Sequence, residues 1–190
     1  MNIAFVLGNG ISRKEIDLHS IKERGKIYGC NSLYKEFTPD VLVATDKLIA
    51  EKIQHTRYAL TNRFYTRRPI IGLGAQTVLH HTFSSGPNAV AIAIADKCPT
   101  IYLIGFDMGP DDKNEFNNVY AGTEFYKAVG STPTYPGNWV KQLTQIMQSN
   151  HEYDFIRVCG STTAIIPELN SIKNLTHLGI SDLKNLINTS

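Results

Sequence analysis

The sequence predicts a single α/β domain with a mostly parallel, Rossmann-like sheet and helices on both faces. Short runs rich in Ile, Val, Leu and Phe recur along the chain, most clearly at 3–7 and 100–104, and such runs indicate buried strands. Segments with the helical spacing of apolar residues lie between them, and this alternation is typical of a parallel sheet. A chain of 190 residues is long enough to bury one proper core.

The first strand leads into the motif G-N-G-I-S-R-K-E-I-D at 8–17, around which the chain is organised. Its glycines permit sharp turns, and Ser12 with Glu15 forms a capping box, so we predict a helix starting at Arg13. A strand, a glycine turn and a helix start leave backbone N–H groups that suit an anion, most often phosphate. The alternative is a tight turn that binds nothing, because the spacing is neither the dinucleotide fingerprint nor a Walker loop.

The first half of the chain continues this alternation. Apolar runs predict strands at 26–30, 41–44 and 58–61, and apolar spacing predicts a helix at 47–54. The stretch 63–82 is predicted as loop or short irregular strand. A short helix or a loop is predicted at 18–25, and one helical turn at 32–37.

The second half starts with Ser84, Ser85, Gly86 and Pro87, the residue types that favour the start of a helix. We predict the helix itself at 88–97.

The strand at 100–104 follows, then an amphipathic helix at 139–148 and a final strand at 155–158. We divide the chain into a nucleotide-binding α/β domain, 1–160, and a packed C-terminal tail, 161–190, that ends in a short helix at 182–188.

The segment 109–137 is polar and too long for an ordinary connection. We predict that it is a lid-like insertion that closes over a ligand. An oligomer contact or a loop packed on itself is an equal alternative, so a homo-oligomer stays open. Neutral donors and aromatic faces for a phosphate or sugar would come from Asn117, Asn118, Tyr120, Thr123 and Tyr126.

Composition narrows the function classes. A net charge of +2 is too small to argue for nucleic acid, and we interpret the basic stretch 57–68 as a solvated face rather than a phosphate site. Cys30, Cys98 and Cys159 fit neither a zinc pattern nor a disulfide framework, which suggests a reducing compartment. No stretch has the length of a membrane span and the N-terminus lacks a signal peptide. We therefore expect a cytoplasmic protein.

Four motifs in order carry a resemblance to known families. They are G-N-G-I-S-R-K-E-I-D at 8–17, G-C-N-S-L-Y at 29–34, P-D-V-L-V-A-T-D at 39–46, and the Ser-Gly helix followed by I-Y-L-I-G-F-D within 84–107. Together they resemble the small bacterial sialyltransferases that use CMP-sialic acid. They also look like the archaeal 6-hydroxymethylpterin diphosphokinase-like family, which shares the nucleotide-binding half. Small phage-encoded proteins look similar too, so a phage origin is a further expectation.

The sialyltransferase resemblance implies specific contacts. In that family the Asn of the glycine turn and the Asn after the second strand contact the nucleotide's phosphate and ribose, and the Ser-Gly helix start contacts nucleotide and donor. The resemblance assigns these roles to Asn9, Asn31, Ser84, Ser85 and Gly86. With the turn and strand-end residues, the predicted nucleotide site comprises Gly8, Asn9, Gly10, Ser12, Asn31, Asp46, Ser84, Ser85 and Gly86.

The chain also departs from the family pattern. The family's catalytic base is a His in a short motif beyond the G-x-D strand, whereas 108–153 holds only His151, in no matching motif. The family's lid contains two tyrosines that support the leaving phosphate, and Tyr120, Tyr126 and Tyr135 are the candidates. His80 and His81 are alternative bases because histidine titrates near neutral pH, although such a pair is more often structural.

Asp46 and Asp107 each follow a predicted strand, so both should lie at the carboxyl edge of the sheet. They could hold Mg²⁺ with a nucleotide diphosphate or triphosphate, or each could cap a helix. Three functions therefore compete. We favour glycosyl transfer from a nucleotide-activated sugar, with Mg-dependent diphosphate transfer and a non-catalytic nucleotide-binding module as the alternatives.

Overall fold

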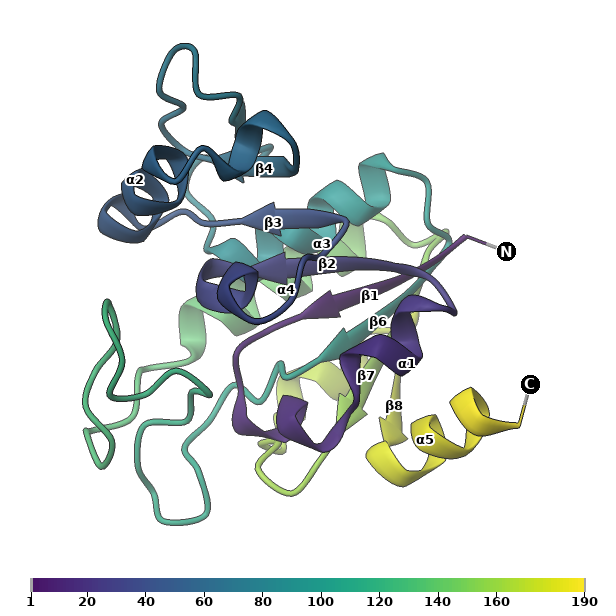
Figure 1. Ribbon diagram of the computed structural model, residues 1–190. Coiled ribbons are helices and arrows are strands. Elements are labelled where there is room, and N and C mark those ends of the chain that lie inside the picture. Colours follow the sequence, from purple (N-terminus) through teal and green to yellow (C-terminus); the bar gives the residue numbers. More distant parts are fainter. Residues whose placement is uncertain (1, 190) are drawn as a thin grey trace.

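Eight parallel strands form one sheet in the order β5-β4-β3-β2-β1-β6-β7-β8 in the computed structural model, which describes residues 2–189 (Figure 1). All seven strand pairs are parallel, which confirms the predicted α/β fold class. The strands are β1 (Ile3–Leu7), β2 (Lys26–Cys30), β3 (Val41–Val43), β4 (Arg63–Thr66), β5 (Gln76–Thr77), β6 (Thr100–Ile104), β7 (Asp154–Cys159) and β8 (Leu175–Gly179).

Helices cover both faces of the sheet. The α-helices are α1 (Leu18–Lys22), α2 (Lys47–His55), α3 (Ser85–Ala95), α4 (Gly137–Ser149) and α5 (Ile180–Asn188), and the 3₁₀ helices are η1 (Ile11–Glu15), η2 (Asn31–Lys35), η3 (Tyr58–Leu60) and η4 (Pro167–Ser171). In the described part of the chain no helix is long and apolar enough to cross a membrane.

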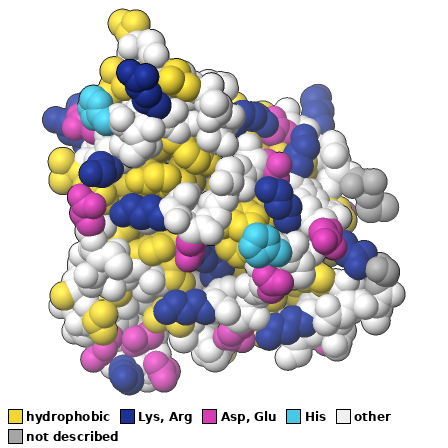
Figure 2. All heavy atoms as spheres, viewed as in Figure 1, with side chains coloured by type: hydrophobic (Ala, Val, Ile, Leu, Met, Phe, Trp, Pro, Cys, Tyr) yellow, Lys and Arg dark blue, Asp and Glu magenta, His cyan; other side chains and the backbone are white. Residues whose placement is uncertain are grey.

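The core consists of two apolar layers separated by the sheet. Along β1, Ala4 and Val6 face the layer that contains α3 and α4. Phe5 and Leu7 face the layer that contains α2 and α5. This alternation follows from the two-residue period of a strand, and burial on both faces explains the continuous apolar run in the sequence. On the face shown in Figure 2, Lys and Arg side chains are mixed with Asp and Glu.

The strand order places a switch point between β1 and β6. From β1 the chain builds outward through β2 and β3 to β5, then returns to pair β6 along the full length of β1, from Ile3↔Thr100 to Leu7↔Ile104. Ligands of open α/β sheets bind outside the carboxyl ends of the strands at such a point. In Figure 1 the segment after β6 loops out beyond this edge of the sheet.

Two local predictions are wrong, and a third is incomplete. The capping box fails, because η1 is a 3₁₀ helix whose N-cap is Gly10, with no side-chain cap. The strand predicted at 58–61 is the 3₁₀ turn η3; Arg57 before it has a left-handed φ of 63°, which turns the chain so that Arg63–Thr66 pairs with β3 instead.

The strand at 155–158 is present but is not the last one. β8 pairs with it at the edge of the sheet. Its central residues, Thr176 and His177, are exposed, so it lacks the apolar run that indicates a buried strand.

Candidate functional site

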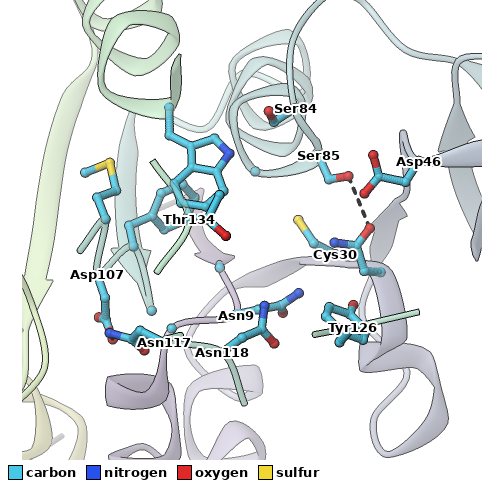
Figure 3. A pocket seen from close by; sticks show the side chains of 18 of the residues that line it. Asn9, Cys30, Asp46, Ser84, Ser85, Asp107, Asn117, Asn118, Tyr126 and Thr134 are labelled. Atoms are coloured by element: carbon cyan, nitrogen blue, oxygen red, sulfur yellow. Dashed lines mark hydrogen bonds between the residues drawn. The ribbon is translucent and has the colours of Figure 1, made fainter. Parts of the chain in front are cut away.

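A cavity of about 470 Å³ opens at the carboxyl edge of the sheet (Figure 3). Its walls come from the turns after β1, β2, β3 and β6, from the start of α3, and from the segment 109–137. Eight of the nine predicted nucleotide-site residues line it: Gly8, Asn9, Gly10, Asn31, Asp46, Ser84, Ser85 and Gly86. The ninth, Ser12, lies behind the wall. The sheet brings these residues together because parallel strands end at one edge.

Glycines allow the turns after β1 and β6 to touch. The Gly8 N–H donates to Ile104 O at 2.8 Å, and the Gly10 N–H donates to Gly105 O at 2.9 Å. A Cβ on Gly8 would lie 2.5 Å from Gly105 O, and Gly105 itself has a φ of 72°. Neither turn could close as tightly with a larger residue.

The start of α3 is joined to the turn after β3 and to Asn31. The Ser85 hydroxyl accepts the Thr45 N–H at 3.0 Å and donates to Asn31 Oδ1 at 3.2 Å. Asn31 has a left-handed φ of 55°, a conformation that Asn tolerates better than most residues. Because the Asn31 oxygen is used in this bond, its NH₂ group is the half available to a ligand.

The amide of Asn9 is held in the same way. Its Oδ1 accepts a hydrogen bond of 3.0 Å from Arg13 Nη1, and its backbone oxygen accepts the Val119 N–H at 2.8 Å. Two amide side chains on the cavity wall therefore have their oxygens occupied and their donors free. Such a site favours a ligand rich in acceptor oxygens, such as a phosphate ester.

Asp107 is a structural hub. It is 2 % exposed, and its carboxylate accepts hydrogen bonds from the N–H and hydroxyl of Ser12, from Asn117 Nδ2, and from the hydroxyls of Thr162 and Thr163. These donors come from the first turn, the segment 109–137 and the loop after β7. The carboxylate thus joins the three parts of the chain that surround this side of the cavity.

Asp46, in contrast to Asp107, has a carboxylate that the described residues leave without hydrogen-bond donors. It is the N-cap residue of α2, yet its side chain makes no capping bond, and it is exposed on the cavity wall. Figure 3 shows Asp46 and Asp107 on opposite sides of the cavity, and the described residues contain no group of three His, Cys, Asp or Glu that could hold a metal. A magnesium ion shared by these two carboxylates stays a prediction. It is not favoured by Asp107, because both oxygens of that carboxylate already accept hydrogen bonds from the protein.

The candidate catalytic residues are scattered. His80 and His81 are exposed and do not line the cavity; the His80 ring stacks on Phe83 with 4.6 Å between centroids. Tyr126 lines the cavity, and burial raises its pKa. Tyr120 lies behind it, and its hydroxyl donates to Glu36 Oε1 at 2.6 Å.

Several cavity residues were not predicted. Arg67 lines the wall and donates to Phe83 O at 2.9 Å, whereas the sequence predicts a solvated face for the basic stretch 57–68 that contains it. Trp139, the first residue of the amphipathic helix predicted at 139–148, also lines the cavity. The signal that identifies Arg67 is its position just after a strand, and that strand begins at Arg63, five residues later than the predicted strand at 58–61.

Comparison with known proteins supports the fold. No protein-family model matches the sequence, and no curated protein matches it significantly. Among solved structures, the chain is similar to the monofunctional α-2,3-sialyltransferase Cst-I from Campylobacter jejuni, with a TM-score of 0.57, 14% identity, and coverage of 98% of this chain and 94% of that one.

The chain is also similar to the sialyltransferase CstII from Campylobacter jejuni in complex with cytidine-5'-monophosphate, a substrate analogue. The TM-score is 0.51 at 16% identity, over 91% of this chain and 84% of that one. A second CstII structure, with a trisaccharide acceptor and CMP, gives a TM-score of 0.52 at 15% identity, over 90% and 85% of the two chains. These neighbours support the sialyltransferase-like fold and not the pterin kinase or the phage origin.

Proposed function

We propose that the cavity binds the nucleotide of a sugar activated by cytidine monophosphate, and that the chain is a glycosyltransferase of the sialyltransferase-like type. The observation that carries this proposal is the convergence of three donor groups on one cavity. They are the start of α3, the free NH₂ group of Asn9 in the turn after β1, and the free NH₂ group of Asn31. Backbone N–H groups at a helix start suit a phosphate, and the similar CstII structures contain CMP.

Within this proposal, Asp46 accepts the proton of the acceptor hydroxyl. The transfer forms a bond between the acceptor oxygen and the anomeric carbon, breaks the bond from that carbon to the phosphate oxygen, and releases the nucleotide. A general base is needed for the hydroxyl proton. Among the described residues that line the cavity there is no His, and Asp46 is the carboxylate whose oxygens accept no hydrogen bond from the protein.

Calorimetry with CMP, CDP, GTP and ATP tests the binding half of the proposal. We expect CMP and CDP to bind more tightly than the purine nucleotides, and no binding of any of them at millimolar concentration would overturn it. Adding EDTA separates this proposal from Mg-dependent diphosphate transfer, because only the latter loses its nucleotide affinity with the metal.

A second candidate is a nucleotide-binding module without catalysis, which is favoured by the lack of a histidine in the cavity wall among the described residues. Hydrolysis of a CMP-activated sugar decides between the two. For a transferase, Asp46→Asn should keep CMP affinity and lose hydrolysis, whereas Asp154→Asn, an exposed position at the start of β7, should keep both. No hydrolysis by the wild-type chain would favour the binding module.

A further inference from the structure

Arg13 is a buried cation directly behind the glycine turn. It is 4 % exposed. Its Nη1 donates to Asn9 Oδ1 at 3.0 Å and more weakly to Gly8 O at 3.4 Å, and its Nη2 donates to Glu36 Oε1 at 2.8 Å and to the Tyr120 hydroxyl at 3.0 Å. The guanidinium carbon also lies 5.2 Å from the centre of the Tyr120 ring. One side chain thus joins the first turn, the end of η2 and the segment 109–137.

Stability alone does not account for a cation at this position. Burying a guanidinium costs several kcal/mol, and a well-packed apolar side chain of similar volume often stabilises a protein as well or better. The carboxylate that pairs with Arg13 belongs to Glu36, whose side chain is 52% exposed, so the pair is partly screened by water. What a guanidinium does and an apolar group cannot do is donate several hydrogen bonds in fixed directions.

Those directions determine which way the Asn9 amide faces. Arg13 can only donate, so the amide must present its oxygen to Arg13 and its NH₂ group elsewhere. Asn9 lines the cavity, and reversing the amide would place its NH₂ group against the N–H groups of Arg13. The guanidinium thereby keeps a donor available on the cavity wall.

The same guanidinium joins Asn9 to the segment 109–137. Val119 donates its N–H to Asn9 O at 2.8 Å, and the next residue, Tyr120, receives Arg13 Nη2. Asn9 is therefore held through its backbone oxygen by the segment and through its side-chain oxygen by Arg13, while Arg13 is itself held by the segment. Movement of the segment away from the turn would break both contacts.

We propose that Arg13 is a positioning residue that couples docking of the segment 109–137 to the direction of the Asn9 amide. With the segment docked, Asn9 offers its NH₂ group to an acceptor oxygen in the cavity; with the segment undocked, the amide rotates freely and the donor is no longer fixed. The identity of that oxygen, a phosphate oxygen of CMP, rests on the proposed function. The coupling between Arg13 and the segment does not.

A double-mutant cycle tests whether Arg13 acts through Asn9. We expect Arg13→Met and Asn9→Ala each to weaken CMP binding about tenfold, the upper range for one hydrogen bond, and the double variant to bind no more weakly than Asn9→Ala alone. Lys14→Met removes the same charge from an exposed neighbour and should leave the affinity unchanged. Losses that multiply in the double variant, or an equal loss in Lys14→Met, would overturn the proposal.

Hydrogen exchange without nucleotide tests whether Arg13 holds the segment 109–137 against the first turn. The Val119 amide should exchange about tenfold faster in Arg13→Met than in the wild type, and Lys14→Met should match the wild type. Unchanged exchange at Val119 would overturn the coupling. If Arg13→Met does not fold, Tyr120→Phe removes only the hydroxyl that joins Arg13 and Glu36 and should give the same acceleration. If the wild type binds no CMP, the proposed function fails while this measurement still decides the role of Arg13.

Discussion

The hydroxyl of Ser12 donates to the carboxylate of Asp107 across 95 positions of the chain. The sequence pattern around Ser12 predicts a helix cap, and the side chain instead fastens the first turn to the turn after β6. The Asp107 carboxylate also accepts hydrogen bonds from the side chains of Asn117, Thr162 and Thr163. The cavity wall on this side is therefore built around one buried carboxylate.

Replacing that carboxylate should destabilise the protein. Asp107→Asn puts an NH₂ group where an oxygen now accepts hydrogen bonds, and we expect the free energy of unfolding to fall by about 3 kcal/mol. Urea denaturation followed by circular dichroism measures it. Asp112→Asn, in an exposed position of the segment 109–137, is the control and should keep the wild-type midpoint. A variant as stable as the wild type would show that the hub does not hold the turns together.

Ser85 should affect CMP binding because its hydroxyl orients the Asn31 amide. Ser85→Ala removes the hydroxyl that donates to Asn31 Oδ1, so the amide is free to rotate, and CMP affinity should fall about fivefold, the value of one modest hydrogen bond. Calorimetry measures the change, with the exposed Ser149→Ala at the end of α4 as the matched control. Equal affinities for Ser85→Ala and the wild type would contradict this reading of the site.

The segment 109–137 should become less accessible to protease when nucleotide is bound. Lys127 lies in this segment and lines the cavity, so trypsin should cut there more slowly with CMP, by about tenfold when CMP is at ten times its Kd and cleavage requires an open form that does not bind. Cleavage at the exposed Lys173, outside the cavity, should not change. The lid prediction fails if cutting at Lys127 is unaffected while calorimetry shows bound CMP.

Alkaline pH should destabilise the protein partly through Cys30. Burial raises the pKa of this cavity-wall thiol from 9.0 to about 12. The neutral thiol therefore stabilises the folded state below pH 9, and this contribution, on the order of 4 kcal/mol at most, is lost as the pH rises from 9 toward 12. The urea midpoint should fall less over this interval in Cys30→Ala than in the wild type. Parallel pH profiles would show that Cys30 is not responsible, leaving residues such as Tyr58, whose pKa is also raised to about 12 by burial.

The sequence by itself determined the parts of the fold that depend on local patterns. The strands Ile3–Leu7, Lys26–Cys30 and Thr100–Ile104 have the predicted bounds, because strands buried on both faces read as unbroken apolar runs. The site could be predicted in outline for a related reason. Turn residues that follow parallel strands must meet at one edge of the sheet, which brings Asn9 and Asn31 together, and the resemblance to sialyltransferases added the helix start at Ser85.

Only the tertiary structure decided the contacts between distant segments. β8 is an edge strand with exposed central residues, so no apolar run reveals it. The bond between Ser12 and Asp107, and the contacts of Arg13 with Glu36 and Tyr120, join residues that no local pattern relates. A buried polar group must find its partners wherever the fold places them, and those partners lie on the turns and the long segment that surround the cavity.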